Sequence, residues 1–95
     1  MAQLTPRLAQ RIRADFTADV ADMVTSYLER VPDDSFGGQN HERVQAALVL
    51  AAGGDWDRFQ AMYHLLRLDW RDVLTAGELA GDDWPQKLTG ELGEP

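Results

Sequence analysis

The sequence predicts an all-α protein, a single compact bundle of five or six short helices. Apolar residues recur at steps of three and four through most of the chain, which is the spacing of one helix face. Capping residues, glycines and prolines separate the apolar segments. No segment alternates apolar and polar residues as a strand does, and β-branched residues are scattered. A chain of 95 residues is one domain, expected to span 1–95 with frayed ends at 1–4 and 93–95.

Residues 6–31 are expected to form the first helical region. Thr5 can cap it, with Pro6 at the first helical position, where a missing N–H costs nothing. Thr17 can cap a second helix, so the region is either two helices or one kinked helix. Pro32 ends it, because the residue before a proline disfavours the α conformation.

Residues 32–40 form the one substantial loop, and 41–52 the next helix, capped by Asn40. The alanines of this helix permit a close approach by a neighbour. Phe36 is the unusual member of the loop. Its ring either tucks into the core, which is the favoured interpretation, or stays outside as a contact.

The segment 53–74 has the most regular apolar pattern. Two glycines can end the preceding helix and Asp55 can cap the next one. Helices are expected at about 56–68 and 70–76, with one bent helix through Asp69 as the alternative. Two neighbouring apolar rows predict that this segment runs through the core. The first row is Trp56, Phe59, Tyr63, Leu66, Trp70 and Val73, and the second is Met62, Leu65 and Leu68.

The dipeptide Asp-Trp occurs three times, ending at Trp56, Trp70 and Trp84. Either it is a repeated binding element, or it is a helix cap followed by a large core residue, which is favoured. The third copy opens a last short helix in which Trp84, Leu88 and Leu92 lie four apart.

Composition excludes several classes of function. The net charge of −7 opposes binding to nucleic acid and to anionic membranes, and it suits a basic protein partner or serves solubility alone. There is no cysteine, so disulfides, thiolate metal sites and a cysteine nucleophile are excluded. No signal-peptide pattern and no apolar run near 18 residues is present. A cytoplasmic protein without membrane contact is expected.

No catalytic constellation is visible. His64 beside Tyr63 has no partner pattern, and the sequence after His41 lacks the second histidine of a zinc helix. Acidic pairs such as Asp33-Asp34 suit turns and caps. The sequence therefore predicts no cofactor and no metal. The remaining polar set is expected to join helix ends, with Arg43 or Arg71 paired to a carboxylate of another helix. This set is Glu42, Arg43, Gln45, Arg71 and Asp72.

The segments 42–47 (ERVQAA) and 69–74 (DWRDVL), with the turn GGD at 53–55 between them, resemble segments of small all-helical bacterial proteins. The resemblance covers roughly residues 40–81 and leaves the N-terminal third unmatched. It implies a bacterial, cytosolic, all-α protein. No activity is assigned to that group, so the resemblance implies no catalytic residue.

These observations favour a non-enzymatic interaction or regulatory module that binds another protein. The expected binding partner is a basic protein or a second copy of this chain. Two alternatives stay open: a homo-oligomeric structural protein, and a small-molecule or metal-dependent enzyme with an inter-helix site near His64. The candidate interaction residues are Phe36, Trp56, Trp70, Arg71 and Trp84.

Overall fold

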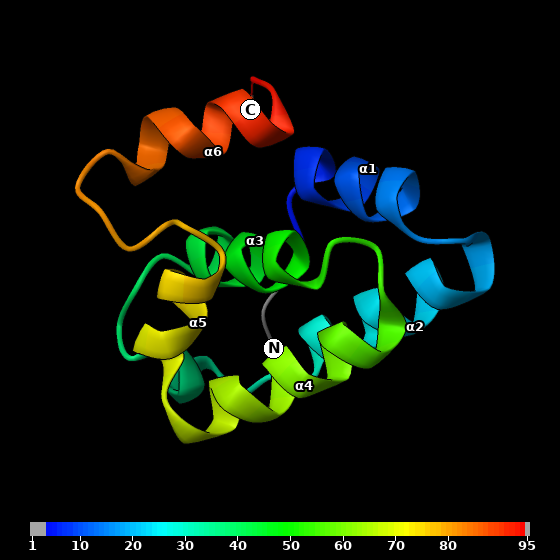
Figure 1. The fold of residues 1–95 in the computed structure, drawn as a ribbon, viewed down its shortest axis with the longest axis horizontal. Coiled ribbons are helices and arrows are strands. Elements are labelled where there is room, and N and C mark those ends of the chain that lie inside the picture. The colour runs from blue at the N-terminus through cyan, green and yellow to red at the C-terminus, as the bar shows by residue number, and fades with distance from the viewer. Residues whose placement is uncertain (1–3, 95) are drawn as a thin grey trace.

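The computed structural model describes residues 4–94, which form six α-helices and one short 3-10 turn, with no strand among them (Figure 1). This confirms the predicted all-α bundle. The frayed ends expected at 1–4 and 93–95 fall largely outside the described range, on residues 1–3 and 95. In chain order the elements are α1 (Pro6–Asp15), α2 (Ala18–Glu29), η1 (Asp33–Phe36), α3 (His41–Ala52), α4 (Trp56–Leu68), α5 (Trp70–Ala76) and α6 (Trp84–Leu92).

The first helical region is two helices. Phe16 and Thr17 adopt extended backbone between α1 and α2. Thr5 caps α1 as expected, because its hydroxyl accepts the backbone N–H of Leu8 at 3.4 Å. Thr17 stands at the cap position of α2 but makes no capping hydrogen bond with its side chain.

The segment after α3 is also two helices. Gly53 ends α3 in the left-handed conformation, with φ at 58°. Asp55 then accepts the N–H of Asp57 at 2.9 Å and so caps α4. Asp69 is extended, with φ at −160°, and accepts the N–H of Arg71 at 3.0 Å. The chain therefore breaks at Asp69, where the capping side chain replaces the lost helical partner.

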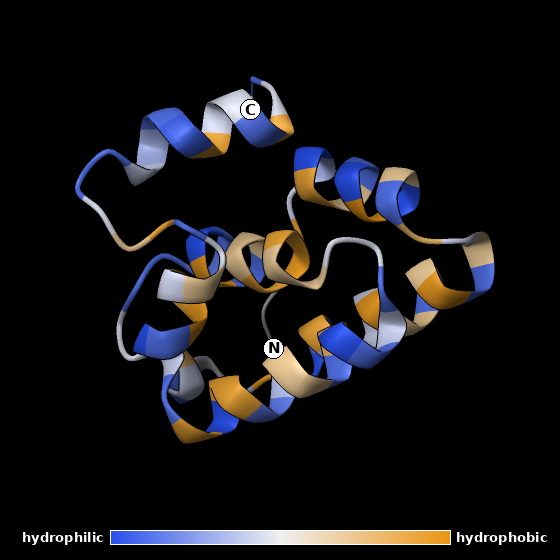
Figure 2. Ribbon diagram, in the orientation of Figure 1, coloured by the Kyte–Doolittle hydropathy of each residue, from blue (hydrophilic) through white to orange (hydrophobic). Residues whose placement is uncertain are grey.

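The centre of the bundle is α3, and the expectation that the segment 53–74 runs through the core was wrong for α4. Figure 1 shows α3 between the other helices, and it contacts α1, α4, α5, α6 and η1. Within α4 only Phe59 and Leu66 are buried, its charged residues Asp57, Arg58 and Arg67 are exposed, and hydrophilic segments alternate with apolar ones along its ribbon (Figure 2). The small side chains of α3 explain the difference, because they allow neighbours to pack all round it. Its buried residues are Val44, Gln45, Ala46, Ala47, Leu48, Val49 and Ala52.

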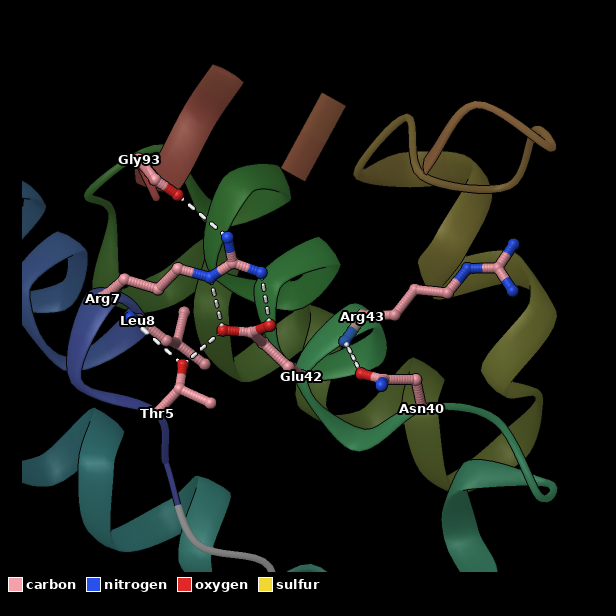
Figure 3. Close-up of polar contacts among 7 residues, drawn as sticks. All are labelled: Thr5, Arg7, Leu8, Asn40, Glu42, Arg43 and Gly93. Carbon is pink, nitrogen blue, oxygen red and sulfur yellow. Dashed lines mark hydrogen bonds and ion pairs between the residues drawn. The ribbon is translucent and has the colours of Figure 1, made fainter. Parts of the chain in front are cut away.

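An ion pair joins α1 to α3 (Figure 3). Arg7 donates to the two carboxylate oxygens of Glu42 at 2.7 and 2.8 Å, and the hydroxyl of Thr5 donates to the same carboxylate. A third donor of Arg7 reaches the carbonyl of Gly93 at 2.9 Å, just after α6. The two charged side chains are only 12 and 13 % exposed. We call this set the Arg7–Glu42 clasp; it holds three helices at one point.

The prediction that Arg43 or Arg71 pairs with a carboxylate of another helix was wrong, because Arg7 makes that pair. Arg43 donates to the carbonyls of Leu79 at 3.0 Å and Ala80 at 3.2 Å, and Arg71 pairs with the neighbouring Asp69 at 3.1 Å. Neither bonds a carboxylate of another helix.

Gln45 is a buried polar residue at the centre of α3. Its side chain is 1 % exposed, and neither its amide nitrogen nor its oxygen has a hydrogen-bond partner among the described residues. A buried amide without partners costs about 1–3 kcal/mol of stability.

The substitution Gln45→Met, which keeps the length of the side chain, should therefore raise the free energy of unfolding by about 1 kcal/mol or more in urea titrations. Gln45→Ala is the control, because its cavity should lower that free energy. An unchanged or lowered urea midpoint for Gln45→Met would contradict the conclusion that the buried amide of Gln45 lacks hydrogen-bond partners.

The Arg7–Glu42 clasp should make stability depend on pH. The hydrogen bond from Arg7 lowers the pKa of Glu42 below its ordinary value, with the Thr5 hydroxyl acting in the same direction and burial opposing both. Because the folded pKa is the lower one, the stabilisation is present above the unfolded pKa, near 4.3, and is lost as the pH falls through the folded pKa.

Glu42→Gln should lower the free energy of unfolding by about 1.5–3 kcal/mol at pH 7. The difference from the parent chain should shrink as the pH falls below about 4. Urea unfolding at a series of pH values measures both. Glu29→Gln, on α2, is the control, since Glu29 makes no ion pair among the described residues. A loss that is equal at pH 3 and pH 7 would show that the charge of Glu42 is irrelevant.

Candidate functional site

The three tryptophans occupy three unrelated places, and Trp56 belongs to the core. Its ring stacks on Phe59 with centroids 5.6 Å apart and meets Tyr27 of α2 edge-on at 5.4 Å. Phe59 itself is fully buried. Aromatic pairs in these geometries stabilise packing beyond the area that they bury. The half-buried Trp56 therefore joins α2 to α4.

Trp84 packs the first residue of α6 against Arg43 of α3. The guanidinium of Arg43 lies 5.0 Å from the centre of its ring, within cation–π range. The same guanidinium bonds the carbonyls of Leu79 and Ala80, so one arginine of α3 holds both the α5–α6 connection and the first residue of α6. Asp83 makes no capping hydrogen bond with its side chain, so the third Asp-Trp pair differs from the first two.

Trp70 packs on the turn that follows η1. Gly37 has φ at 60°, and a Cβ at Gly37 would overlap the indole nitrogen of Trp70. The ring therefore lies directly on the backbone of this turn. Arg71 extends beside the ring, 5.7 Å from its centre. Phe36, in η1, is fully buried, and its ring lies 4.4 Å from the ring of His41, tilted by 33°. The tucked interpretation of Phe36 is confirmed, and its place among candidate surface residues was wrong.

The most exposed large apolar side chain among the described residues is Leu68, at 83 %. It is the last residue of α4, where the chain turns into α5. A shallow cavity of about 370 Å³ adjoins it. We call this region the corner surface; it comprises Arg67, Leu68, Trp70 and Arg71 with Asp34 and Ser35 from η1.

Sequence reasoning assigned Leu68 to the second apolar row and so missed its exposure. That row lies within the expected helix 56–68, but Leu68 is the last residue of α4 and Asp69 ends the helix directly after it. The cap at Asp69, which the sequence did show, is the signal that Leu68 has no following turn to cover it.

A second cavity lies beneath α6. We call it the α6 groove; its volume is about 570 Å³, and α1, α3, the end of α5 and α6 contribute to it. Its lining residues are Arg11, Leu50, Ala76, Gly77, Glu78, Leu79, Lys87, Gly90 and Glu91. Arg11 bonds Asp15 at 3.0 Å and Glu91 at 3.1 Å. Burial lowers the pKa of the Arg11 guanidinium, but the bonds to Glu91 and Asp15 together outweigh it, so the pKa lies above its ordinary value. No pattern in the sequence marked the groove, because its walls come from distant segments.

One wall of the α6 groove contains an unusual backbone conformation. Glu78 has φ at 62°, the left-handed region that glycine ordinarily fills. The N–H of Leu79 bonds the carbonyl of Leu74 at 2.9 Å, and that of Glu78 bonds Thr75 at 3.1 Å. These two bonds form a Schellman motif at the end of α5. Glycine stands one position earlier, at Gly77, where a Cβ would overlap the backbone of Ala47.

His64, the centre of the enzyme alternative, is exposed on α4 and lines neither cavity. Within residues 4–94, no three metal-binding side chains gather at one point. In the same part of the chain, each helix is too short or too polar to cross a bilayer.

Comparisons with protein-family models, with curated proteins and with solved structures find no match to this chain. The resemblance of the segments 42–47 and 69–74 to small bacterial helical proteins therefore stays a prediction.

Glycine at position 78 should stabilise the protein. Glu78→Gly removes the steric cost of a left-handed side chain, which is about 1–2 kcal/mol, less the extra entropy that glycine loses on folding. We expect the thermal midpoint to rise by a few degrees. Thermal unfolding followed by circular dichroism measures this. Glu94→Gly, at a residue that lies outside the helices, is the control and should not rise. A lowered thermal midpoint for Glu78→Gly would mean that the side chain of Glu78 stabilises the fold by more than its left-handed backbone conformation destabilises it.

Proposed function

We propose that this protein is a non-enzymatic interaction module of the cytoplasm, which binds another protein through the corner surface. The exposure of Leu68 supports this most strongly. Burying one leucine side chain contributes about 1.5–3 kcal/mol, and Leu68 leaves most of that gain for a partner. A single exposed leucine is ordinary, but this one lies beside Trp70 and Arg71. Tryptophan and arginine are the residue types that most often dominate binding energy in interfaces.

The corner surface also has the form of a binding site. Leu68 protrudes beside a concave region whose rim includes Arg67, Arg71 and Asp34. Charged groups of this region select partners and orient them, while the protruding Leu68 supplies apolar contact area. The net charge of −7 attracts a basic protein at long range and disfavours nucleic acid. All three tryptophans are partly buried against the core, but only Trp70 lines the cavity beside Leu68.

The test compares two exposed apolar residues on different helices. Leu68→Asp should abolish capture of the partner by tagged protein in its source cells, because an aspartate would place a charge in the centre of the interface. Met23→Asp, on α2, is the matched control, since Met23, at 41 %, is the other exposed large apolar residue within 4–94. Both substitutions should leave stability within about 0.5 kcal/mol.

A protein enriched by the parent chain and by Met23→Asp, but not by Leu68→Asp, would support the proposal. Equal enrichment by all three chains, or none above background, would overturn it. Sedimentation velocity over a range of concentrations identifies self-association: if the partner is a second copy, the parent chain shifts to a dimer and Leu68→Asp stays monomeric.

A further inference from the structure

We propose that the α6 groove is a binding site for a small zwitterionic ligand, of the kind formed by a free apolar α-amino acid. Such a ligand carries one ammonium, one carboxylate and an apolar side chain. The site is separate from the corner surface and does not depend on the proposed function.

The size and lining of the groove suit a small molecule. Its volume of about 570 Å³ lies within the range of ordinary ligand sites, roughly 300–1,000 Å³. Leu50 and Ala76 supply an apolar portion, and charged groups from two helices (Arg11 of α1, Lys87 and Glu91 of α6) and one loop (Glu78) surround it. Ligand sites commonly combine an apolar wall with a few polar groups in this way.

Two residues of the groove are unfavourable for the fold. Glu78 occupies the left-handed position of a Schellman motif, where glycine costs least. Gly90 lies inside α6, where alanine would be more stable by about 1 kcal/mol. Neither steric crowding nor backbone conformation requires glycine there, because its φ is not positive and a Cβ would meet nothing within 4 Å. Departures from local preference gather at functional sites, and here both line one cavity.

The charges of the groove indicate what kind of ligand it accepts. Arg11 and Glu91 are paired with each other at 3.1 Å, and Arg11 also bonds Asp15. Lys87 contacts only the carbonyl oxygen of Glu78, at 3.4 Å, and the Glu78 carboxylate makes no ion pair among the described residues. The groups left for a ligand are therefore the ammonium of Lys87, whose nitrogen lies beside the backbone of Glu78, and the carboxylate of Glu78. A purely anionic ligand would meet Glu78, and a purely cationic one would meet Lys87.

The ligand would then bind through three contacts. Its carboxylate would pair with Lys87 and its ammonium with Glu78, while its side chain would lie on Leu50 and Ala76. The absent side chain at Gly90 lets the ligand approach the backbone of α6.

The experiment titrates the labelled full-length protein with L-leucine, N-acetyl-L-leucine and L-leucinamide, and follows backbone amides by two-dimensional NMR. The two analogues lack the free ammonium and the carboxylate, respectively. L-leucine should shift the amides of Gly77 and Gly90, with a dissociation constant of roughly a millimolar, and each analogue should bind about tenfold more weakly. No localised shift with L-leucine, or binding of either analogue as tight as that of L-leucine, would overturn the proposal.

Variants separate recognition from folding. Lys87→Gln should weaken L-leucine and remove its advantage over L-leucinamide, whereas Glu78→Gln should remove its advantage over N-acetyl-L-leucine. A purely structural role would not produce this exchange of selectivity. Glu78→Gly is expected to be more stable yet to bind L-leucine about tenfold more weakly. If it binds as tightly as the parent chain, Glu78 does not contact the ligand and the proposal fails. Glu29→Gln, outside the groove, should bind L-leucine like the parent chain.

Discussion

The close packing of neighbours around the alanine-rich α3 is the constraint on which the rest of the structure depends. Because α3 is buried on nearly all sides, the chain that leaves α5 must pass directly over Ala47, and only glycine fits at position 77. The left-handed position of the turn then falls on Glu78. One steric requirement at the centre therefore determines how α5 ends, how the connection to α6 is directed, and which side chain stands at the mouth of the α6 groove.

Helix boundaries could be predicted from the sequence because they depend on local chemistry. Thr5, Asn40, Asp55 and Asp69 each accept backbone N–H groups at the start of a helix, and these bonds involve residues two or three positions away. The choice of the central helix could not be predicted in the same way. Large apolar side chains made α4 seem the core element, yet burial on all sides favours small side chains, and α3 has them.

The contacts between helices could not be predicted from the sequence either, and the reason is physical. Arg7, Arg11 and Arg43 all donate to backbone carbonyls of the α6 region, as well as to side chains. A carbonyl is present at every residue, so such a bond leaves no trace in the residue types. The sequence therefore indicated that arginines join helix ends but not which ones. The α6 groove escaped prediction similarly, since it arises where separate helices meet.

The attachment of α6 has a consequence for access to the groove. Residues 77–83 tie α6 to α5, so its docking on α1 and α3 is an intramolecular event. A short tether keeps a binding element at an effective concentration in about the millimolar range, where contacts too weak to join separate chains still suffice. α6 thus acts as a tethered ligand of the five-helix body. Leu88, Trp84 and the arginine bonds hold it there, and because Lys87, Gly90 and Glu91 belong to α6, the groove is complete only while α6 is docked.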